Sequence, residues 1–557
     1  MAAGAMTYAG HNRLVKSKDL VLPVPNMNSS TSEDLIDSVK GSANQRLFGF
    51  GLFGVCLLIA AIYVGVQLNH DLTIAPSGTA VSYFLLATAL LIALGFEFVN
   101  GFHDTANAVA TVIYTRSLPA SFAVVWSGGW NFVGVMVSSG AVAFAVLQLL
   151  PIDLVLNVGS GVGFAMVFAL LIAAIIWNLG TWSLGLPSSS SHTLIGSIIG
   201  VGLMNQLMHG GAASSSVDWS QAWNVGKSLL VSPLVGFFFA ALLLYALKLL
   251  VRVPALYAEP KGDQPPPFWI RSILILTCTG VSFAHGSNDG QKGMGLIMLI
   301  LIGTVPAAYA LNRTVTPSET QTFISVAHHA SEVLGRYTAG VAPVASPRDE
   351  IEHYIDRHQA TPATLVALRQ LTDTIGSQAG QSPSLSDVPQ TQVNNVRNNM
   401  YLTAEGLRLM AKAKQPSFAP ADQAVLDNYH SLLDRSTKFI PTWVKVAVAI
   451  ALGLGTMVGW RRIVRTVGER IGKEHLTYAQ GASAELVAAI TIGAADRFGL
   501  PVSTTHVLSS GVAGAMVANG SGLQWSTIRS LLMAWVLTLP VSIALAAGLF
   551  WVFRHVF

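Results

Sequence analysis

The stretch Asn-Gly-Phe-His-Asp-Thr-Ala-Asn at residues 100–107 borders two apolar runs, and a related stretch, His-Gly-Ser-Asn-Asp-Gly-Gln-Lys, occupies residues 285–292. Glycine and aspartate keep register at an offset of 185 residues, whereas histidine and asparagine exchange places around the glycine. A second pair, Leu-Pro-Ser-Ser-Ser-Ser-His at 186–192 and Leu-Pro-Val-Ser-Thr-Thr-His at 500–506, repeats at an offset of 314. The offsets differ by 129, the length of the polar stretch 312–440. The sequence therefore predicts an internal duplication with one insert, which is typical of secondary transporters.

The amino-acid composition is typical of a membrane protein. Of its 557 residues, 52% are hydrophobic and only 11% are charged, whereas soluble chains carry about 25% charged residues. The insert holds 23 of the charges and residues 1–46 hold nine, so the other 382 positions carry only 28. We therefore expect an all-α polytopic membrane protein. A soluble enzyme and a disordered protein are excluded, and the net charge of +4 gives no signal for nucleic-acid binding.

Common catalytic and metal-binding motifs are missing from the sequence. There is no P-loop, metalloprotease motif or nucleophile elbow, so we expect neither an enzyme nor an ATP-driven pump, and no cofactor. The two cysteines, Cys56 and Cys278, lie in apolar runs and are expected to pack there. The histidines of the insert have no known ligand spacing, so no metal site of the protein is expected.

Apolar runs and the duplication divide the chain into seven parts. We expect broken helices and two re-entrant hairpins, because several runs are shorter than the ~20 residues of a span. The expected parts are a tail (1–46), an extra transmembrane helix and loop (47–80), a first repeat (81–251), a linker (252–269), the start of a second repeat (270–311), a soluble, mostly helical insert (312–440), and the rest of the second repeat (441–557).

Parity and positive charge predict the topology. If 81–116 and 121–150 each cross once, 161–208 is a re-entrant hairpin and 228–251 crosses once, the first repeat crosses three times, so the second is inverted. Arginine and lysine gather in two connections, 252–271 and 461–473. The positive-inside rule then places the N-terminus and both connections in the cytoplasm and the insert in the periplasm.

Two aspartates, Asp104 and Asp289, hold the same position in their repeats. A carboxylate at mid-membrane depth costs at least ~2.5 kcal/mol and therefore marks a transport pathway. A structural ion pair or helix cap is the alternative, but it is not expected twice at equivalent places. The residues expected to bind or carry the coupling ion are Glu97, His103, Asp104, Asn107, Asn288, Asp289, Gln291 and Lys292.

The two hairpin tips combine a proline, a run of hydroxyl residues and a histidine before an apolar helix. A helix N-terminus offers free N–H groups and partial positive charge, so anions bind there, and the hydroxyls add donors. Ordinary N-capping is the alternative. Two such tips would surround one small tetrahedral oxyanion. Its expected contacts are Ser189, Ser190, Ser191, Thr193, Ser503, Thr504, Thr505, Gly101 and Gly286.

For four further residues the sequence allows two roles each. His192 and His506 follow the tips and either titrate or hold a backbone carbonyl. Glu97 and Glu485 lie in apolar helices and are either titrating groups or buried structural acids.

These paired motifs resemble the inorganic phosphate transporter (Pit) family. The stretches 95–116, 177–200, 281–300 and 497–516 are similar to its bacterial low-affinity permeases of enterobacterial type. The resemblance covers 81–311 and 442–557 and implies symport of inorganic phosphate with a cation in the bacterial inner membrane. It also implies a substrate site between the repeats, a homodimer, divalent metal ions as co-substrate in a neutral metal–phosphate complex, and arsenate as a competitor.

One departure from the family pattern concerns the coupling ion. The signature usually has asparagine before aspartate in both copies, and this pair is associated with sodium in sodium-coupled relatives. Here His103 replaces the first asparagine, whereas Asn288 remains. A titratable imidazole favours protons, so we expect a proton-coupled phosphate symporter. Sodium coupling, another oxyanion such as sulfate, and a membrane-embedded hydrolase are the alternatives.

Overall fold

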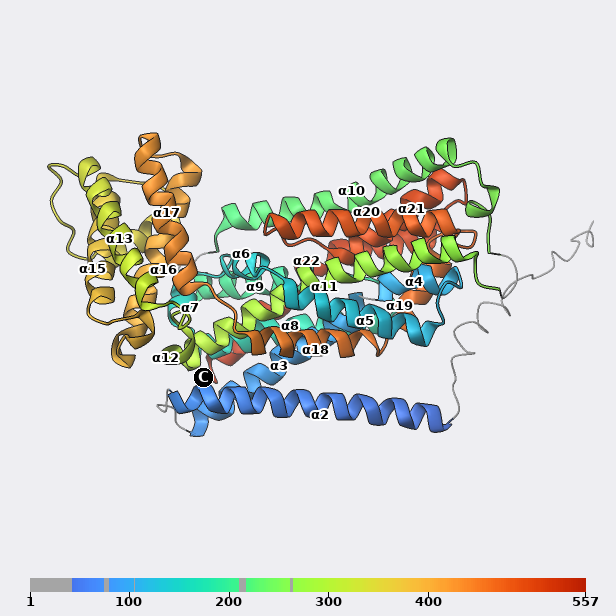
Figure 1. Cartoon of the computed structure of the whole chain (residues 1–557), viewed down its shortest axis with the longest axis horizontal. Coiled ribbons are helices and arrows are strands. Elements are labelled where there is room, and N and C mark those ends of the chain that lie inside the picture. Colours follow the sequence, from blue (N-terminus) through green and yellow to red (C-terminus); the bar gives the residue numbers. More distant parts are fainter. Residues whose placement is uncertain (1–42, 75–79, 105, 210–216, 261–263, 557) are drawn as a thin grey trace, which may run out of the picture. The chain divides into compact units, whose positions relative to one another are not determined.

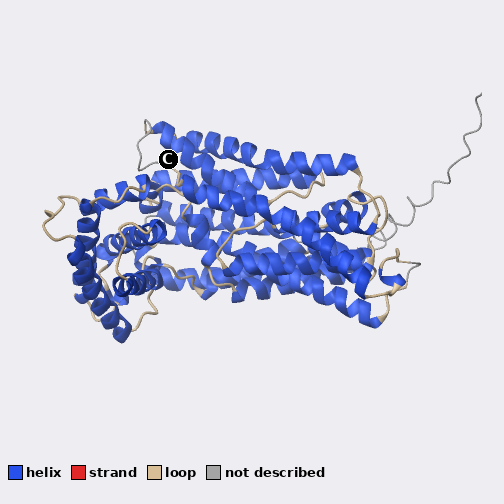
Figure 2. Ribbon diagram, turned by 90° about the horizontal axis from the view of Figure 1, so that it is seen from above, coloured by secondary structure: helices blue, strands red, loops and turns tan. Residues whose placement is uncertain are grey.

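The structure is a computed structural model that describes residues 43–74, 80–104, 106–209, 217–260 and 264–556. Every regular element in this part of the chain is a helix, as predicted (Figures 1 and 2). Within these described ranges, seven helices are long and apolar enough to cross a membrane, or eight if one bent pair forms a single span. Of the expected tail, 1–46, residues 1–42 lie outside the described part of the chain.

The helices that precede the insert contain both signature motifs. They are α2 (Ala43–Ile74), α3 (Ala80–Asp104), α4 (Ala106–Tyr114), α5 (Ala120–Val137), α6 (Ala141–Leu147), α7 (Ile152–Leu156), α8 (Gly161–Ser183), α9 (Ser190–Met208), α10 (Trp219–Leu250), η2 (Pro254–Leu256), α11 (Phe268–Thr304) and α12 (Pro306–Tyr309).

The rest of the chain forms the insert and the second half of the apolar part. The insert holds α13 (Pro317–Tyr337), α14 (Pro347–Arg357), α15 (Pro362–Gly380), η3 (Leu385–Asp387), α16 (Gln390–Ala413) and α17 (Pro420–Thr437). After it come α18 (Thr442–Thr456), α19 (Arg461–Arg465), η4 (Thr466–Arg470), α20 (Tyr478–Arg497), α21 (Thr504–Asn519) and α22 (Trp525–Arg554).

Helix contacts follow the duplication seen in the sequence. Helix α3 packs against α18, and its counterpart α11 packs against α5. In the same way α9 packs against α22, whereas α21 packs against α10. Each half of the chain therefore buries its helices largely against the other half, and α8–α9 and α20–α21 form the two matching hairpin pairs.

Both signature glycines lie at these contacts between helices. A Cβ atom at Gly101 would come within 2.2 Å of the Leu452 carbonyl oxygen on α18. A Cβ atom at Gly286 would come equally close, 2.2 Å, to the Asn131 carbonyl oxygen on α5. Close approach of backbones is the usual role of glycine between membrane helices, and it accounts for both residues without a contact to an anion.

Two helical segments differ from what the sequence predicted. The second signature was expected to break its helix, but α11 runs without interruption from Phe268 to Thr304. The run 121–150, expected as one crossing, divides into α5, which is itself long and apolar enough to span, and α6, with Gly140 in the left-handed region at φ 88° between them. A continuous α11 satisfies its own backbone, as a buried membrane helix must.

The insert is mostly helical, as predicted. Four of its helices carry proline in the first turn, where the missing N–H costs nothing. Helix α13 also has a capping box, in which Thr316 and Glu319 bond each other's backbone N–H. The backbone and hydroxyl of Thr316 donate to the Glu319 carboxylate and thereby lower its pKa. Local sequence signals thus define these helices well.

Candidate functional site

Asp104 joins the two hairpin tips. Its carboxylate accepts a short hydrogen bond from Ser190 Oγ at the start of α9 and one from Thr505 Oγ1 of α21 at 2.5 Å. The His103 ring nitrogen Nδ1 lies 3.1 Å from the same carboxylate. Asp104 is only 3% exposed. One carboxylate at the end of α3 therefore contacts residues that are more than 300 positions apart in the chain.

Asp289 and Lys292 form a buried ion pair on α11. Lys292 Nζ donates to Asp289 Oδ1 at 2.5 Å, and both residues are almost completely buried. The same ammonium group donates to Ser191 Oγ of the first tip at 2.5 Å. Thr504 Oγ1 of the second tip donates to Asp289 Oδ2 at 3.3 Å. The second aspartate is thus also linked to both tips, once directly and once through Lys292.

The two aspartates and a histidine, His285 of α11, have the spacing of a cation site. One ligand atom each of Asp104, His285 and Asp289 lies within 4.8 Å of the others. His285 Nε2 is 3.5 Å from Asp289 Oδ2, and its Nδ1 is 2.8 Å from Asn131 Oδ1. The sequence had assigned no metal ligands. Two carboxylates and an imidazole suit a proton, a sodium ion or a divalent metal by their chemistry.

The first hydroxyl of each tip caps its helix. Ser189 accepts from His192 N and Ser503 accepts from His506 N, each at 3.1 Å. Thr193 donates to Asn178 Oδ1 at 3.0 Å within the first hairpin pair. The capping interpretation therefore describes Ser189 and Ser503. The hydroxyls that face the aspartates are the next ones along the chain, namely Ser190, Ser191, Thr504 and Thr505.

The remaining signature residues hold the tips in place. His103 Nε2 lies 3.1 Å from Thr181 Oγ1 near the first tip. Asn288 Nδ2 donates to the Leu500 carbonyl oxygen of the second tip at 3.2 Å. Gln291 Nε2 donates to Asp496 Oδ1 at 2.5 Å and its Oε1 accepts from Val142 N at 2.9 Å. The side chain of Asn107 lies outside the described residues.

The sequence allowed two interpretations for each of four residues, and all four are buried: Glu97, Glu485, His192 and His506. Glu97 Oε2 accepts from Asn100 Nδ2 at 3.4 Å, and Glu485 Oε2 accepts from Thr277 Oγ1 at 2.6 Å. The second oxygen of each carboxyl has no hydrogen-bond partner in the described part of the chain. The rings of His192 and His506 lie 4.6 Å apart, and His506 stacks on Trp535 at 4.1 Å. No side-chain bond from either ring to a backbone carbonyl occurs among the described residues.

The tips meet each other but differ in their surroundings. Ser191 Oγ donates to the Val502 carbonyl oxygen of the second tip at 2.8 Å. The first tip also contacts the basic connection after α18: Trp182 Nε1 donates to the Gly459 carbonyl oxygen at 2.8 Å and Thr466 Oγ1 donates to the Gly185 carbonyl oxygen at 2.7 Å. Gly459 and Thr466 therefore contact the residues that directly precede the first tip.

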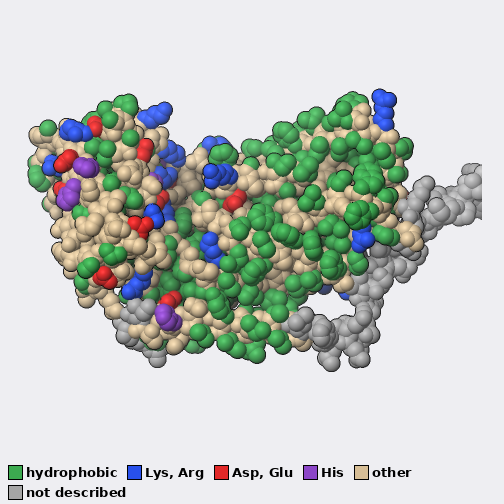
Figure 3. Space-filling model, viewed as in Figure 1, with side chains coloured by type: hydrophobic (Ala, Val, Ile, Leu, Met, Phe, Trp, Pro, Cys, Tyr) green, Lys and Arg blue, Asp and Glu red, His purple; other side chains and the backbone are tan. Residues whose placement is uncertain are grey.

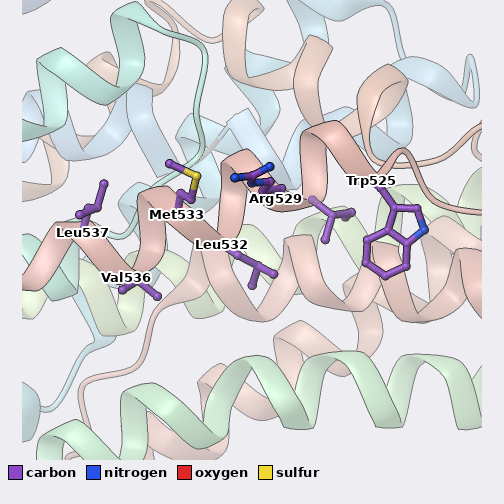
Figure 4. Close-up of a pocket in the computed structure, with 7 residues that line it drawn as sticks. Trp525, Arg529, Leu532, Met533, Val536 and Leu537 are labelled. Atoms are coloured by element: carbon purple, nitrogen blue, oxygen red, sulfur yellow. The ribbon is translucent and has the colours of Figure 1, made fainter.

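A hollow of about 470 Å³ along α22 does not suit an anion. Its lining is apolar except for Arg529, and Figure 4 shows these side chains along one helix. Trp525 and Val536 are each 72% exposed. Exposed apolar side chains on a long apolar helix are what a lipid-facing surface requires, so we place the site at the aspartates instead.

Two residues of the site were missed in the sequence. His285 occupies the repeat position of Asn100, and the exchange of histidine and asparagine between the signatures was the available signal. Asp496, which binds Ser287 Oγ at 2.7 Å as well as Gln291, aligns with Trp182 in the first repeat. The duplication therefore gave no signal for Asp496.

Comparisons with known proteins show the family of the chain. The phosphate transporter family matches residues 100–546. The chain is 44% identical over 484 residues to the low-affinity inorganic phosphate transporter PitA of Escherichia coli strain K12, covering 84% of this chain and 96% of the relative. It is 28% identical to a probable low-affinity inorganic phosphate transporter of Bacillus subtilis, covering 85% and 99%. A solved structure, "The sodium-dependent phosphate transporter", matches with a TM-score of 0.46 and 19% identity over 85% of this chain and all of that one. The chain is a multi-pass membrane protein that belongs to the phosphate transporter family.

Proposed function

We propose that this protein takes up inorganic phosphate across a bacterial inner membrane by symport with protons. The observation that carries the proposal is the double contact of Asp104 with Ser190 and Thr505, one from each hairpin tip. The hydroxyls that would bind a tetrahedral oxyanion are thus already bound to an anion of the protein. The names of the relatives support phosphate as that oxyanion.

This arrangement suggests how phosphate and a proton are coupled. An ionised Asp104 competes with phosphate for the same hydroxyl donors, because a carboxylate is a strong acceptor. A protonated Asp104 accepts more weakly and carries no charge, so the donors become available to phosphate. The same reasoning applies to Asp289, which holds Thr504 and Lys292. A proton bound near the aspartates therefore favours phosphate binding, and the two are released together.

The choice of a proton rests on His103, whose ring touches Asp104. An imidazole titrates near physiological pH, unlike the asparagine usual at this place. Sodium coupling is the alternative, because Asn288 and the carboxylates offer oxygen atoms. The same transport assay tests divalent metal ions as co-substrate, arsenate as a competitor and sulfate as another substrate. Size analysis tests a homodimer.

The proposed arrangement in the membrane is an inverted repeat. The paired helix contacts support two equivalent halves, with α8–α9 and α20–α21 as re-entrant hairpins that approach from opposite faces. The basic connection 461–473 would lie in the cytoplasm with the N-terminus, and the insert would lie in the periplasm.

Ser190→Ala tests the anion site. We expect the apparent KM for phosphate to rise roughly 10- to 100-fold, because a hydrogen bond to a charged group contributes about 1.5–3 kcal/mol. Ser197→Ala is the matched control: Ser197 lies on the same helix, is buried, and donates to the Thr193 carbonyl oxygen of its own helix. Radiolabelled phosphate uptake measures both. An unchanged KM in Ser190→Ala would remove this tip from the binding site.

Orientation can be tested with single cysteines in a chain that carries Cys56→Ser and Cys278→Ala. Ser377→Cys, exposed on α15, should react with an impermeant thiol reagent added outside intact spheroplasts. Glu474→Cys, exposed directly after the basic connection, should react only after the membrane is opened. The opposite pattern would contradict the proposed topology.

A further inference from the structure

Two adjoining hollows lie where the insert meets the apolar helices. Their volumes are about 740 and 570 Å³, and we call them together the insert hollow. They share five lining residues, listed here as Ala145, Gln148, Arg408, Phe498 and Gly499. Helices α16 and α17 of the insert form one side, and α6, α10 and the end of α20 form the other.

The charged residues of the insert hollow are mostly basic. Five basic side chains and one acidic side chain line it, namely Lys227, Arg408, Lys412, Arg435, Lys438 and Asp434. Figure 3 shows lysine and arginine side chains where the insert borders the apolar part. A concave surface lined by one sign of charge concentrates ions of the opposite sign.

Three of the basic groups are neutralised by neighbouring carboxylates. Arg408 bonds Glu405 through two nitrogens, Lys438 Nζ lies 2.7 Å from Asp434 and Arg435 lies 2.6 Å from Glu319. In contrast, Lys227 and Lys412 have no carboxylate of a described residue within 4.0 Å. Lys227 comes from α10 and Lys412 from α16, so the unbalanced positive charge faces the hollow from both sides.

The floor of the insert hollow is the second hairpin tip. Residues 498–502 line it, and α21 begins two residues later at Thr504. The Val502 carbonyl oxygen accepts from Ser191 Oγ, which also binds Lys292. The Leu500 carbonyl oxygen accepts from Asn288 Nδ2. The second tip therefore borders the hollow and also contacts residues of the aspartate site.

We propose that the insert hollow is an anion vestibule that gathers free phosphate anions and delivers them to the second hairpin tip. This proposal rests on the proposed phosphate uptake, and it gives the insert a role in transport. The positive charges attract the phosphate monoanion and dianion. A neutral metal–phosphate complex gains nothing from them, so the vestibule favours the free anion as the species that is collected.

The first test removes the two unbalanced charges. Lys227→Gln with Lys412→Gln should lower the maximal rate divided by KM for phosphate roughly 3- to 10-fold at low ionic strength, with an unchanged maximal rate. The loss should disappear at about 0.5 M salt, because screening shortens the range of the charges to a few ångströms. Arg369→Gln, exposed on α15 outside the hollow, removes one positive charge elsewhere on the insert; it is the control and should show no loss. Right-side-out membrane vesicles and radiolabelled phosphate provide the assay.

The second test does not depend on phosphate transport. Ser228→Cys, which lines the hollow beside Lys227, should react faster with an anionic thiol reagent than with a cationic one of the same size. The ratio of the two rates should fall roughly 3- to 10-fold in the double lysine variant but not in Arg369→Gln. An unchanged ratio would overturn the vestibule. A lowered ratio with unaltered phosphate uptake kinetics at low salt would overturn its role in delivery, whereas failure of the parent to transport phosphate would contradict the proposed function alone.

Discussion

Asp104→Asn is expected to abolish concentrative phosphate uptake while the protein still folds and inserts. Asp289→Asn is expected to abolish uptake as well, at a cost in stability, because it leaves the buried Lys292 ammonium group without its partner. Asparagine has nearly the shape of aspartate but cannot ionise, so it resembles the protonated carboxyl group in charge. Each elementary charge that moves against the membrane potential costs about 2.3 kcal/mol per 100 mV, and a fixed neutral group cannot cycle a proton to offset this. Exchange of internal for external phosphate should survive, because the hydroxyl donors are released from the carboxylate.

The measurement is radiolabelled phosphate uptake into proteoliposomes, with and without an imposed gradient, followed by exchange without one. Asp373→Asn, exposed on α15, is the matched control and should accumulate phosphate normally. If Asp104→Asn and Asp289→Asn also accumulated phosphate at the normal rate, neither carboxylate would carry the coupling ion.

Lys292→Gln is expected to destabilise the fold and to stop transport. Removal of one partner from a buried ion pair leaves an uncompensated charge, which costs about 3–5 kcal/mol, and Asp289 is fully buried. The double variant Lys292→Gln, Asp289→Asn removes both charges. It should recover most of the lost thermal stability while remaining unable to accumulate phosphate.

Size-exclusion chromatography after heating in detergent measures the stability of the single and double variants. The recovery in the double variant separates a charge effect from a packing effect. A single variant as stable as the parent would contradict the ion pair as a stabilising contact of the site. A double variant that accumulates phosphate would contradict its role in transport.

Much of this organisation was predictable from the repeated motifs. Apolar composition indicated an all-helical membrane protein, and the offsets of the Gly-Asp and Pro-hydroxyl-His motifs located the insert. The hairpin tips were expected to meet because of their duplication, and the Ser191–Val502 contact joins them. The insert helices were also predictable, because proline and Thr316 mark their starts.

Other features depend on contacts that a linear pattern does not contain. The sequence suggested a break in the helix at the second signature, but α11 continues through Asp289. Gly101 and Gly286 were predicted as residues near an anion, and the structure adds that each lies against the backbone of a neighbouring helix, α18 and α5 respectively. His285 and Asp496 join the site only through the packing of α11 against α5 and α20. The role of such a residue depends on which helices lie next to it. The sequence indicated the role only where both repeats carry an equivalent residue.

The most direct test of the account is phosphate uptake by the unaltered protein in proteoliposomes under one imposed gradient at a time. With sodium absent and the outside acidic, the account predicts accumulation of labelled phosphate that collapses when a protonophore is added. An inward sodium gradient at equal pH on both sides should produce no accumulation. Uptake that follows the sodium gradient and ignores the pH gradient would contradict proton coupling, and no phosphate uptake under either gradient would contradict the account as a whole.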